Sequence, residues 1–255
     1  MTADTSAPDQ PYVRYAAADG VAVLTLDSPH NRNALSARLV GELLAGIDAA
    51  EADDDVRVVV VRSSGRVFCS GADLSEAGRG MEEGARAIVE VQRRIVASAK
   101  PFVVRLDGPV RAGGTGIVAA ADVVVAADDA TFALTEVKLG LAPLVISLTV
   151  LPRLTQRAAS LAALGGEVFT AAQAAEWGLV TRAVPAAEVE AAVDAVVASL
   201  RTGAAQGLRE TKALLNRDLL ARIERDGDEL AAASARLFAS DEARAAMTAF
   251  LSRGR

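Results

Sequence analysis

The sequence predicts an α/β protein in which strand–strand–helix units repeat and a mostly helical region follows. Runs of β-branched residues such as "VRVVVVRSS", residues 56–64, are typical of strands that are buried on both faces. Other segments carry apolar residues three or four positions apart, which predicts amphipathic helices. The order strand, strand, helix recurs up to Pro143, and beyond it nearly every segment has helical periodicity and a high alanine content.

The first half of the chain is expected to begin with a β-hairpin. Residues 12–29 hold two strand-like runs on either side of Asp19-Gly20, a dipeptide typical of two-residue turns. Ser36 then precedes a helical pattern over residues 37–53 and is a favourable N-cap. Further strands are expected at residues 56–64, 102–108, 122–128 and 131–137, and further helices at residues 84–99 and 113–121.

The second half is expected to be helical, and the chain divides into three parts. Residues 1–11 are polar and acidic, lack the basic and apolar regions of a signal peptide, and are expected to form a disordered tail. Residues 12–200 are expected to form the core with the ligand site, and residues 201–255 a helical region. The helices expected after Pro143 cover residues 145–154, 172–178, 185–200, 208–219 and 228–253.

The composition excludes several classes of function. Of the 255 residues, 51% are hydrophobic and 24% charged, which is typical of a soluble globular protein. The formal net charge of −6 and the pI of about 5.0 provide no basic field for nucleic acid or an anionic membrane. The longest apolar stretch, around residues 113–127, is interrupted by Asp122 and is too short to span a bilayer. The single cysteine excludes an internal disulfide and fits a reducing, cytoplasmic location.

The glycine-rich run "AGGTGIVAAAD", residues 112–122, is the first candidate for chemistry. It lacks the lysine of a Walker phosphate loop and the spacing of a dinucleotide-binding turn. Two interpretations remain, close packing of a helix against a strand or backbone N–H groups that bind an oxyanion. The stretch "SGADL", residues 70–74, is a second loop of small residues that enters a helix. Two such loops, each after a hydrophobic strand, favour an oxyanion hole.

Two residues that could serve as base or nucleophile are weak candidates. His30, the only histidine, lies in the polar loop "SPHNRNALS", where a histidine is commonly solvated. Cys69 has no second histidine to activate it, so a small buried hydrophobic residue is the favoured interpretation.

Five blocks follow one another along the chain: "SPHNRNALS", "VFCSGADL", "DGPVRAGGTGIVAAAD", "FALTEVKLGLAP" and "GEVFTAAQAAEWGLVTRAVP". In this order the sequence resembles the enoyl-CoA hydratase/isomerase, or crotonase, superfamily, from about Tyr12 to the closing "MTAFLSRGR". The resemblance implies a crotonase spiral of ββα repeats with a C-terminal helical trimerisation region, in a homotrimer or homohexamer. It also implies an acyl-CoA thioester as substrate, with no metal and no separate cofactor because coenzyme A is part of the substrate.

The resemblance also assigns roles to individual residues. The backbone amides of Ala72 and Gly113 would form the oxyanion hole for the thioester carbonyl oxygen, and Glu136 would be the catalytic acid/base. The residues themselves point the same way, because a glutamate flanked by Leu134 and Val137 is costly to bury without a purpose. The residues implied in CoA binding are Arg32, Ala34, Leu35, Gly71, Asp73, Leu74, Phe250 and Arg253.

One position departs from the family pattern. Typical hydratases carry a first glutamate three residues after the central oxyanion glycine, and this chain has Gly116 there. Hydration usually uses one group to deprotonate water and another to deliver a proton to Cα, whereas moving a double bond needs only one base. On mechanistic grounds, Gly116 therefore favours an isomerase over a hydratase. In contrast, "TEVKLGLAPLVISLTV" resembles methylglutaconyl-CoA hydratase-like members, which commonly carry glycine at this position.

The function expected first is that of an enoyl-CoA hydratase, which adds water to a 2-enoyl-CoA through an oxyanion-stabilised enolate. Two alternatives stay open: an enoyl-CoA Δ3-Δ2 isomerase that uses Glu136 alone, and a non-catalytic acyl-CoA-binding protein. A dehalogenase of the same fold is disfavoured, because the aspartate nucleophile of its members aligns with Leu144.

Overall fold

The structure, a computed structural model, describes residues 10–76 and 80–253, with the backbone alone for residues 250–253. Most of the predicted tail over residues 1–11 therefore lies outside the described residues. In the described part, no helix is long and apolar enough to cross a membrane.

A six-stranded sheet forms the centre of the fold. Its strands lie in the order β1 (Val13–Ala18), β2 (Val21–Leu26), β3 (Val58–Ser63), β4 (Phe102–Leu106), β6 (Val123–Ala127) and β9 (Arg182–Val184). Only the β1–β2 pair is antiparallel among these neighbours. All four valines over residues 58–61 are buried, which is the pattern of a parallel strand covered on both faces.

A second, smaller sheet explains the repeat seen in the sequence. It consists of β5 (Val110–Arg111), β7 (Thr131–Ala133) and β8 (Phe169–Thr170). β4 joins the large sheet and the next strand, β5, the small one; β6 and β7 are divided in the same way. The pairs β4–β5 and β6–β7 thus each give one strand to each sheet, and the predicted order strand, strand, helix is confirmed where α3 (Gly113–Ala120) follows β5.

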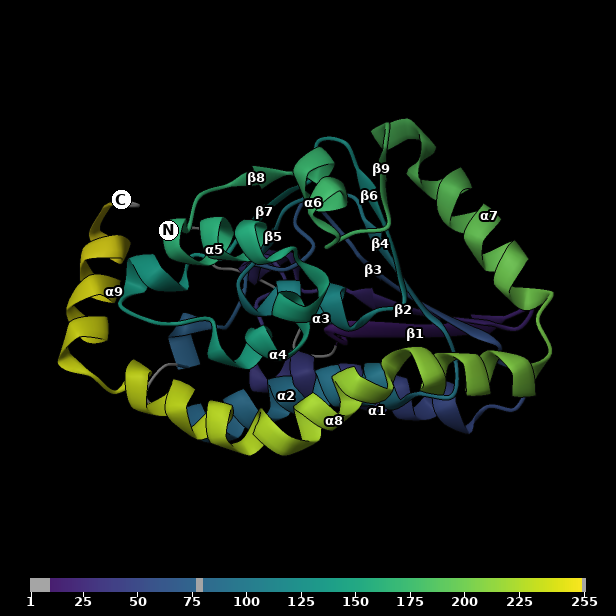
Figure 1. The fold of residues 1–255 in the computed structure, drawn as a ribbon, viewed down its shortest axis with the longest axis horizontal. Helices are drawn as coiled ribbons and strands as arrows, with labels where there is room; N and C mark the ends of the chain where they lie inside the picture. Colours follow the sequence, from purple (N-terminus) through teal and green to yellow (C-terminus); the bar gives the residue numbers. More distant parts are fainter. Residues whose placement is uncertain (1–9, 77–79, 254–255) are drawn as a thin grey trace.

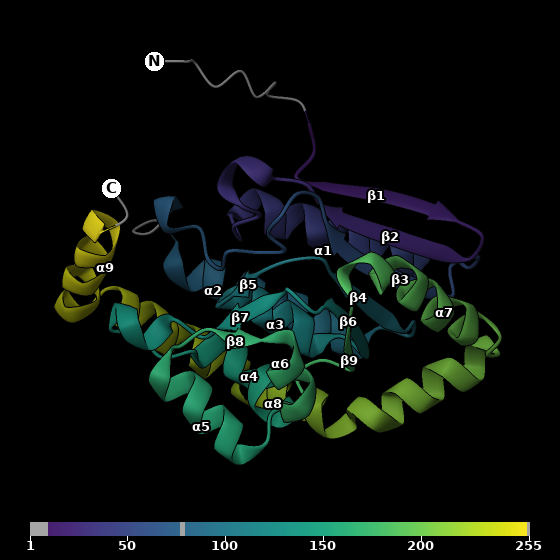
Figure 2. The ribbon, with the colours of Figure 1, turned by 90° about the horizontal axis from the view of Figure 1, so that it is seen from above.

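Helices cover both faces of the large sheet, as Figures 1 and 2 show. α1 packs on β1 and β2, while α7 packs on β3, β4 and β6. α8 runs along α2 and α4, and α9 lies at the far end of the molecule from β1 (Figure 2). The bounds of the remaining helices are α1 (Ala37–Ala52), α2 (Met81–Ala97), α4 (Leu144–Arg153), α5 (Gln156–Gly165), α6 (Ala171–Trp177), α7 (Val189–Arg201), α8 (Ala205–Phe238) and α9 (Asp241–Arg253). Four short 3-10 helices are η1 (Pro29–Asn31), η2 (Leu74–Glu76), η3 (Glu136–Leu139) and η4 (Ala186–Glu188).

Local signals at the start of the chain are confirmed. Asp19 and Gly20 have φ values of 51° and 79°, the left-handed pair that a type I′ hairpin turn requires. The Ser36 hydroxyl accepts a 3.3 Å hydrogen bond from the Leu39 amide and so caps α1.

The second half differs from the prediction in three places. The segments predicted over residues 208–219 and 228–253 do not break between 219 and 228, because α8 continues to Phe238 and the chain turns before Asp241. Gly227 lies inside α8 and faces α2. A Cβ at this position would come within 2.8 Å of Val89 Cγ1, so glycine permits the two helices to pack closely. α5 was not among the predicted helices. The short strands β8 and β9 interrupt a half that was predicted to be helical, since pairing with β7 and β6 stabilises them.

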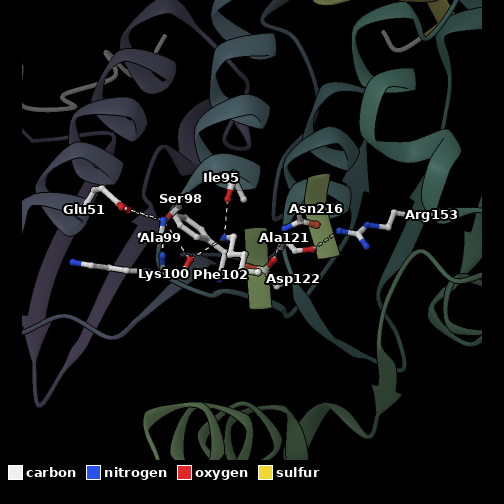
Figure 3. A network of polar contacts seen from close by, with 11 residues as sticks. Glu51, Ile95, Ser98, Ala99, Lys100, Phe102, Ala121, Asp122, Arg153 and Asn216 are labelled. Atoms are coloured by element: carbon white, nitrogen blue, oxygen red, sulfur yellow. Dashed lines mark hydrogen bonds and ion pairs between the residues drawn. The ribbon is translucent and has the colours of Figure 1, made fainter. Parts of the chain in front are cut away.

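A buried cation fastens α8 to the core. Lys212 is 4% exposed, and its Nζ donates 2.8 Å hydrogen bonds to the carbonyls of Ile95 and Lys100 and pairs with Asp122 Oδ2 at 2.8 Å. Asp122 accepts further hydrogen bonds from the Asn216 side chain at 2.9 Å and the Phe102 amide at 2.8 Å. Figure 3 shows this network between the end of α2 and the strands. Burial lowers the pKa of Lys212, and the charge of Asp122 opposes that shift.

Candidate active site

Four chain segments lie side by side in parallel: the segment at Leu35, the segment 69–72, β5 and β7. Bridges or ladders join Leu35 to Ala72, Cys69 to Val110, and β5 to β7, all in parallel. Backbone hydrogen bonds run from Leu35 N to Gly71 O at 2.8 Å, from Arg111 N to Cys69 O at 2.9 Å, and from Ala112 N to Ala133 O at 3.1 Å. Because the carboxyl ends of parallel segments meet at the same edge, the row brings Leu35, Ala72 and Gly113 together, and the chain continues from the end of β7 to Glu136.

Ala72 and Gly113 lie next to each other across this row. A Cβ on Gly113 would lie 3.7 Å from Ala72 N and only 2.9 Å from Leu35 Cδ1, so glycine keeps the space between the segments open. In the described part of the chain, neither amide donates a hydrogen bond to a backbone carbonyl. Gly113 is the first residue of α3, where N–H groups have no partner within the helix. The two amides are thus adjacent and free, as an oxyanion hole requires; their binding of a carbonyl oxygen stays a prediction.

The backbone before Gly113 is strained. Ala112 has φ 43° and ψ −119°, a conformation that residues with a Cβ rarely adopt and that costs on the order of 1–3 kcal/mol. Gly71, opposite, has φ 97°, and a Cβ on it would meet Ala112 Cβ at 3.1 Å. Strain of this kind persists only when the surroundings fix it, and it is commonly found at functional sites.

Glu136 is half-buried, and one oxygen of its carboxyl group has no partner among the described residues. It begins η3, so the prediction that it lies in a strand is wrong: β7 ends at Ala133, and the chain turns before Glu136. Its Oε2 is shielded from solvent and has no hydrogen-bond partner among the described residues. Burial raises the pKa of Glu136 to about 7, with a smaller opposing effect of a backbone hydrogen bond. A carboxyl group with this pKa can both accept and release a proton near neutral pH.

The space beside Gly116 is filled by other side chains. A Cβ on Gly116 would lie 3.0 Å from Ile146 Cγ2 and 3.2 Å from the side-chain Cδ and Oε1 of Gln92. Gln92 is fully buried, and its Nε2 donates 3.2 Å hydrogen bonds to the carbonyls of Ile88 and Val145. The hydroxyl of Thr149 donates to Gln92 Oε1 at 2.6 Å. The described side chains nearest to a Cβ at Gly116 thus come from Ile146 and Gln92, and neither is a carboxyl group.

The predicted CoA loop is held by a buried asparagine. Asn33 has φ 53°; its Oδ1 accepts from the Ser28 amide at 2.7 Å and its Nδ2 donates to the Val67 carbonyl at 2.9 Å. This anchor leaves Arg32 exposed and buries Ala34 and Leu35 to 6% exposure each. The buried side chain of Leu35 therefore lies directly beside Gly113 in the row of parallel segments.

The other residues predicted to bind CoA differ in how far they are buried. Gly71 is buried in the row, and Leu74 is half-buried at the start of η2. Burial opposes ionisation of Asp73, but hydrogen bonds from Ser75 and Asn31 outweigh it and lower the pKa of Asp73. Phe250 and Arg253 lie in α9, and their side chains lie outside the described residues.

The two weak candidates lie as the sequence suggested. His30 is exposed, with Tyr12 Oη at 3.5 Å and Ser28 Oγ at 3.4 Å. Cys69 is fully buried, and its burial raises the pKa of the thiol to about 12. A thiol that stays protonated is a poor nucleophile, so the hydrophobic interpretation of Cys69 is confirmed.

Sequence reasoning missed Gln92 and Thr149. A signal was present, because Gln92 lies four residues after Ile88 and three before Ile95, on the apolar face of the helix predicted over residues 84–99. A glutamine on such a face is a polar group in the core, which must find hydrogen-bond partners. Its neighbours at Gly116 and Thr149 come from distant parts of the chain and are not visible in the local pattern.

Comparisons with known proteins identify the family and the fold of the chain. A family model described as enoyl-CoA hydratase/isomerase matches residues 16–255. The crystal structure of an enoyl-CoA hydratase from Mycobacterium avium is 47% identical, covers 96% of this chain and 97% of its own, and has a TM-score of 0.90. An enoyl-CoA hydratase from Mycobacterium avium subsp. paratuberculosis is 32% identical over 95% and 96% of the chains, with a TM-score of 0.86. The trans-2-decenoyl-acyl-carrier-protein isomerase of Streptococcus mutans is 30% identical over 80% of this chain and 81% of its own.

Proposed function

The chain belongs to the enoyl-CoA hydratase/isomerase family, and from this premise we propose that it moves the double bond of an enoyl-CoA from the 3- to the 2-position. Glu136 is the only acid/base of this reaction. It removes a proton from Cα of the 3-enoyl thioester and returns it to Cγ, so that one C–H bond breaks and another forms. The electron pair passes through an enolate, and no oxidant, reductant or water is consumed.

The thioester carbonyl oxygen would bind between the amides of Ala72 and Gly113. These donors count most when the oxygen becomes negatively charged, and loss of one such donor typically costs ~10²-fold or more in rate. The positive end of the α3 dipole at Gly113 adds to the same stabilisation. Enolate chemistry of this type needs two donors and a base, so the proposal includes no cofactor beyond the CoA of the substrate.

The observation that carries the proposal is the carboxyl group of Glu136 together with the lack of one at position 116. Glu136 has a raised pKa and an unpartnered oxygen, while Gly116 is covered by Gln92 and Ile146 where a second carboxyl group would have to lie. The amide of Gln92 is engaged with Ile88, Val145 and Thr149, and an amide cannot act as a general base at neutral pH. One base suffices for proton transfer between two carbons of the same substrate.

Hydration of a 2-enoyl-CoA is the second candidate, and it was the function expected first from the sequence. The names of the similar Mycobacterium avium structures favour it. In this case the ionised carboxyl of Glu136 would take a proton from the attacking water and then deliver that proton to Cα, so the same group must reach both atoms in turn.

Two thioesters separate these functions. With 3-hexenoyl-CoA, isomerisation produces a conjugated thioester, and the ultraviolet absorbance of that group should rise. With crotonyl-CoA, hydration removes the conjugation, and the absorbance should fall. A rise with the first compound and no change with the second supports the isomerase; the reverse supports the hydratase. If neither signal moves while both thioesters raise the melting temperature, the protein is a non-catalytic acyl-CoA binder.

The loop at Arg32, Ala34 and Leu35, with Asp73 and Leu74, is proposed to hold the CoA part. Exposed Arg32 would meet phosphate, since its guanidinium can form paired hydrogen bonds with phosphate oxygens. Phe250 and Arg253 are retained in this proposal on the resemblance alone.

The protein is further proposed to be a homotrimer or homohexamer. Exposed leucines on α5 support this, because Leu161 and Leu164 are 66% and 77% exposed, and Val168 beyond the helix is 59% exposed. Val137, next to Glu136, is 40% exposed and borders the same surface at Gly166. We name these four side chains, Leu161, Leu164, Val168 and Val137, the α5 patch. A second copy on the α5 patch would also cover η3 and limit access of water to Glu136.

A further inference from the structure

Arg111 joins the strand that leads to the oxyanion donor with the strand that leads to the base. Its Nη1 donates to the Thr131 carbonyl at 2.7 Å and to the Val110 carbonyl at 2.9 Å, and its Nη2 donates to Thr131 Oγ1 at 3.0 Å. Val110 is the first residue of β5, which ends one residue before Ala112 and two before Gly113. Thr131 is the first residue of β7, which runs on toward Glu136.

The backbone contacts between these two strands are few. Their ladder consists of two residue pairs, Val110 with Phe132 and Arg111 with Ala133. One further hydrogen bond follows, from the Ala112 amide to the Ala133 carbonyl. A parallel ladder this short is weak by itself, so a side chain that bridges it makes a large relative contribution.

The contact that Arg111 makes between β5 and β7 matters because strained Ala112 follows β5 directly. The residue is held at positive φ, and relaxation would rotate the peptide between Ala112 and Gly113. That peptide carries the Gly113 N–H, the expected oxyanion donor. Any loosening of β5 from β7 would therefore both turn this donor and change its separation from Glu136.

The environment of Arg111 is unusual for a structural arginine. It is half-buried, and no carboxylate of the described residues lies within ion-pair distance of it. Burial lowers the pKa of the Arg111 guanidinium, and no nearby carboxylate opposes this shift. A half-buried arginine that donates only to carbonyls and a hydroxyl has a desolvation cost that no ion pair offsets, which favours a role in positioning.

We propose that Arg111 is a positioning residue, which clamps β5 to β7 and so fixes the Gly113 amide relative to the Glu136 carboxyl. The inference rests on the proposed enolate chemistry and deepens it. It does not depend on whether the enolate ends as an isomerised or a hydrated product. Arg111 itself touches neither the thioester nor the reacting carbons in this mechanism.

The test is exchange of the Cα protons of butyryl-CoA in D₂O, followed by mass spectrometry. Exchange needs only the base and the oxyanion donors: Glu136 removes a proton from Cα, and a deuteron from the exchanged carboxyl returns. Arg111→Met should lower the exchange rate by ~10- to 100-fold, as expected when reacting groups are displaced by about 1 Å. The dissociation constant of butyryl-CoA should stay within about twofold, since the CoA loop does not involve Arg111.

Arg153→Met is the matched control. Arg153 is also half-buried and donates to carbonyls only, from Nε to Ala119 at 3.0 Å and from Nη2 to Ala121 at 3.4 Å, but at the far end of α3. It should retain nearly the wild-type exchange rate. Arg111→Lys should recover part of the rate, and Thr131→Val, which loses one of the three acceptors, should lie between wild type and Arg111→Met.

The outcomes separate the two proposals. Absence of exchange in the wild type overturns the proposed function and this inference with it. Exchange in the wild type that persists in Arg111→Met, or that falls equally in Arg153→Met, overturns only the role of Arg111. If Arg111→Met does not fold, Arg111→Lys and Thr131→Val decide, and wild-type rates in both would reject the clamp.

Discussion

The hydroxyl of Thr149 lies 2.6 Å from the side-chain oxygen of Gln92 and 3.2 Å from the Gly116 carbonyl, and its single proton is shared between these two acceptors. Gln92, held in place by Thr149, lies where a glutamate at position 116 would begin its side chain: a Cβ there would be 3.2 Å from Gln92 Cδ and Oε1. It therefore links the core packing of α2 and α4 to the chemistry available at the start of α3.

Gly116→Glu should destabilise the protein and should not create hydratase activity. The new side chain would meet Gln92 and Ile146 at about 3 Å, and overpacking of a core typically costs about 1–3 kcal/mol. The melting temperature should fall by several degrees, and crotonyl-CoA should not lose absorbance. Gly207→Glu is the control, because a Cβ at Gly207 meets nothing within 4 Å and its effect should be small.

The double variant Gly116→Glu/Gln92→Ala removes the obstructing amide. It should melt at a higher temperature than Gly116→Glu and should show hydration of crotonyl-CoA if room for the carboxyl is the limiting factor. A double variant as unstable as the single one would mean that Gln92 does not limit the site.

Glu136→Gln should abolish turnover of 3-hexenoyl-CoA and leave its affinity nearly unchanged. The amide has almost the same shape but cannot accept the Cα proton. In the wild type, kcat/KM should rise with pH to a plateau with an apparent pKa of about 7, because only the ionised carboxyl is the base. Glu167→Gln is the control, since Glu167 is an exposed carboxyl paired with Lys138, and it should keep full activity. Normal turnover by Glu136→Gln would remove this residue from the mechanism.

The same substitution should stabilise the protein at alkaline pH. Below pH 4.5 Glu136 is protonated in both the folded and the unfolded chain. As the pH rises from 4.5 to about 7, the unfolded chain releases this proton first, so the free energy of unfolding falls. The shift corresponds to a loss on the order of 3 kcal/mol above pH 7. Chemical denaturation should thus show Glu136→Gln more stable than wild type at pH 8 and nearly equal to it at pH 4.5. Equal stability at both pH values would contradict the raised pKa of Glu136.

Lys212→Met should be strongly destabilising, by about 3–5 kcal/mol, because it leaves Asp122 half-buried without its cation. Urea unfolding measures this difference. Lys138→Met removes a cation from an exposed pair and should cost less than about 1 kcal/mol. In Lys212→Met/Asp122→Asn the unpaired charge is gone, and part of the lost stability should return.

Leu164→Arg should lower the oligomeric state measured by analytical ultracentrifugation. Leu164 is 77% exposed, so the substitution fills no core position and the circular dichroism spectrum should not change. A charge placed in an apolar contact is not solvated and opposes association. Tyr15→Arg, which alters an exposed residue of β1 away from the α5 patch, should keep the wild-type mass. Unchanged mass in both variants would exclude the α5 patch as the contact.

Local patterns determined most of the elements in the first half of this protein. Asp19-Gly20, the Ser36 cap and the valine run of β3 each act over a few residues, and their structures follow from steric and hydrogen-bonding preferences of those residues. The second half was less predictable. Alanine-rich segments favour helices everywhere, so the end of α8 and the strands β8 and β9 depend on partners that lie far away in the sequence.

For the site, the sequence by itself determined the candidates: Ala72, Gly113 and Glu136 were identified from their blocks, and Gly116 as the departure from the family pattern. Only the tertiary structure decided their surroundings. It placed four short parallel segments in a row, left Glu136 Oε2 without a partner, and filled the space beside Gly116 with Gln92 from α2. Burial and contact between residues distant in the chain set the pKa of a carboxyl group and the room for a side chain, and neither is encoded in a local pattern.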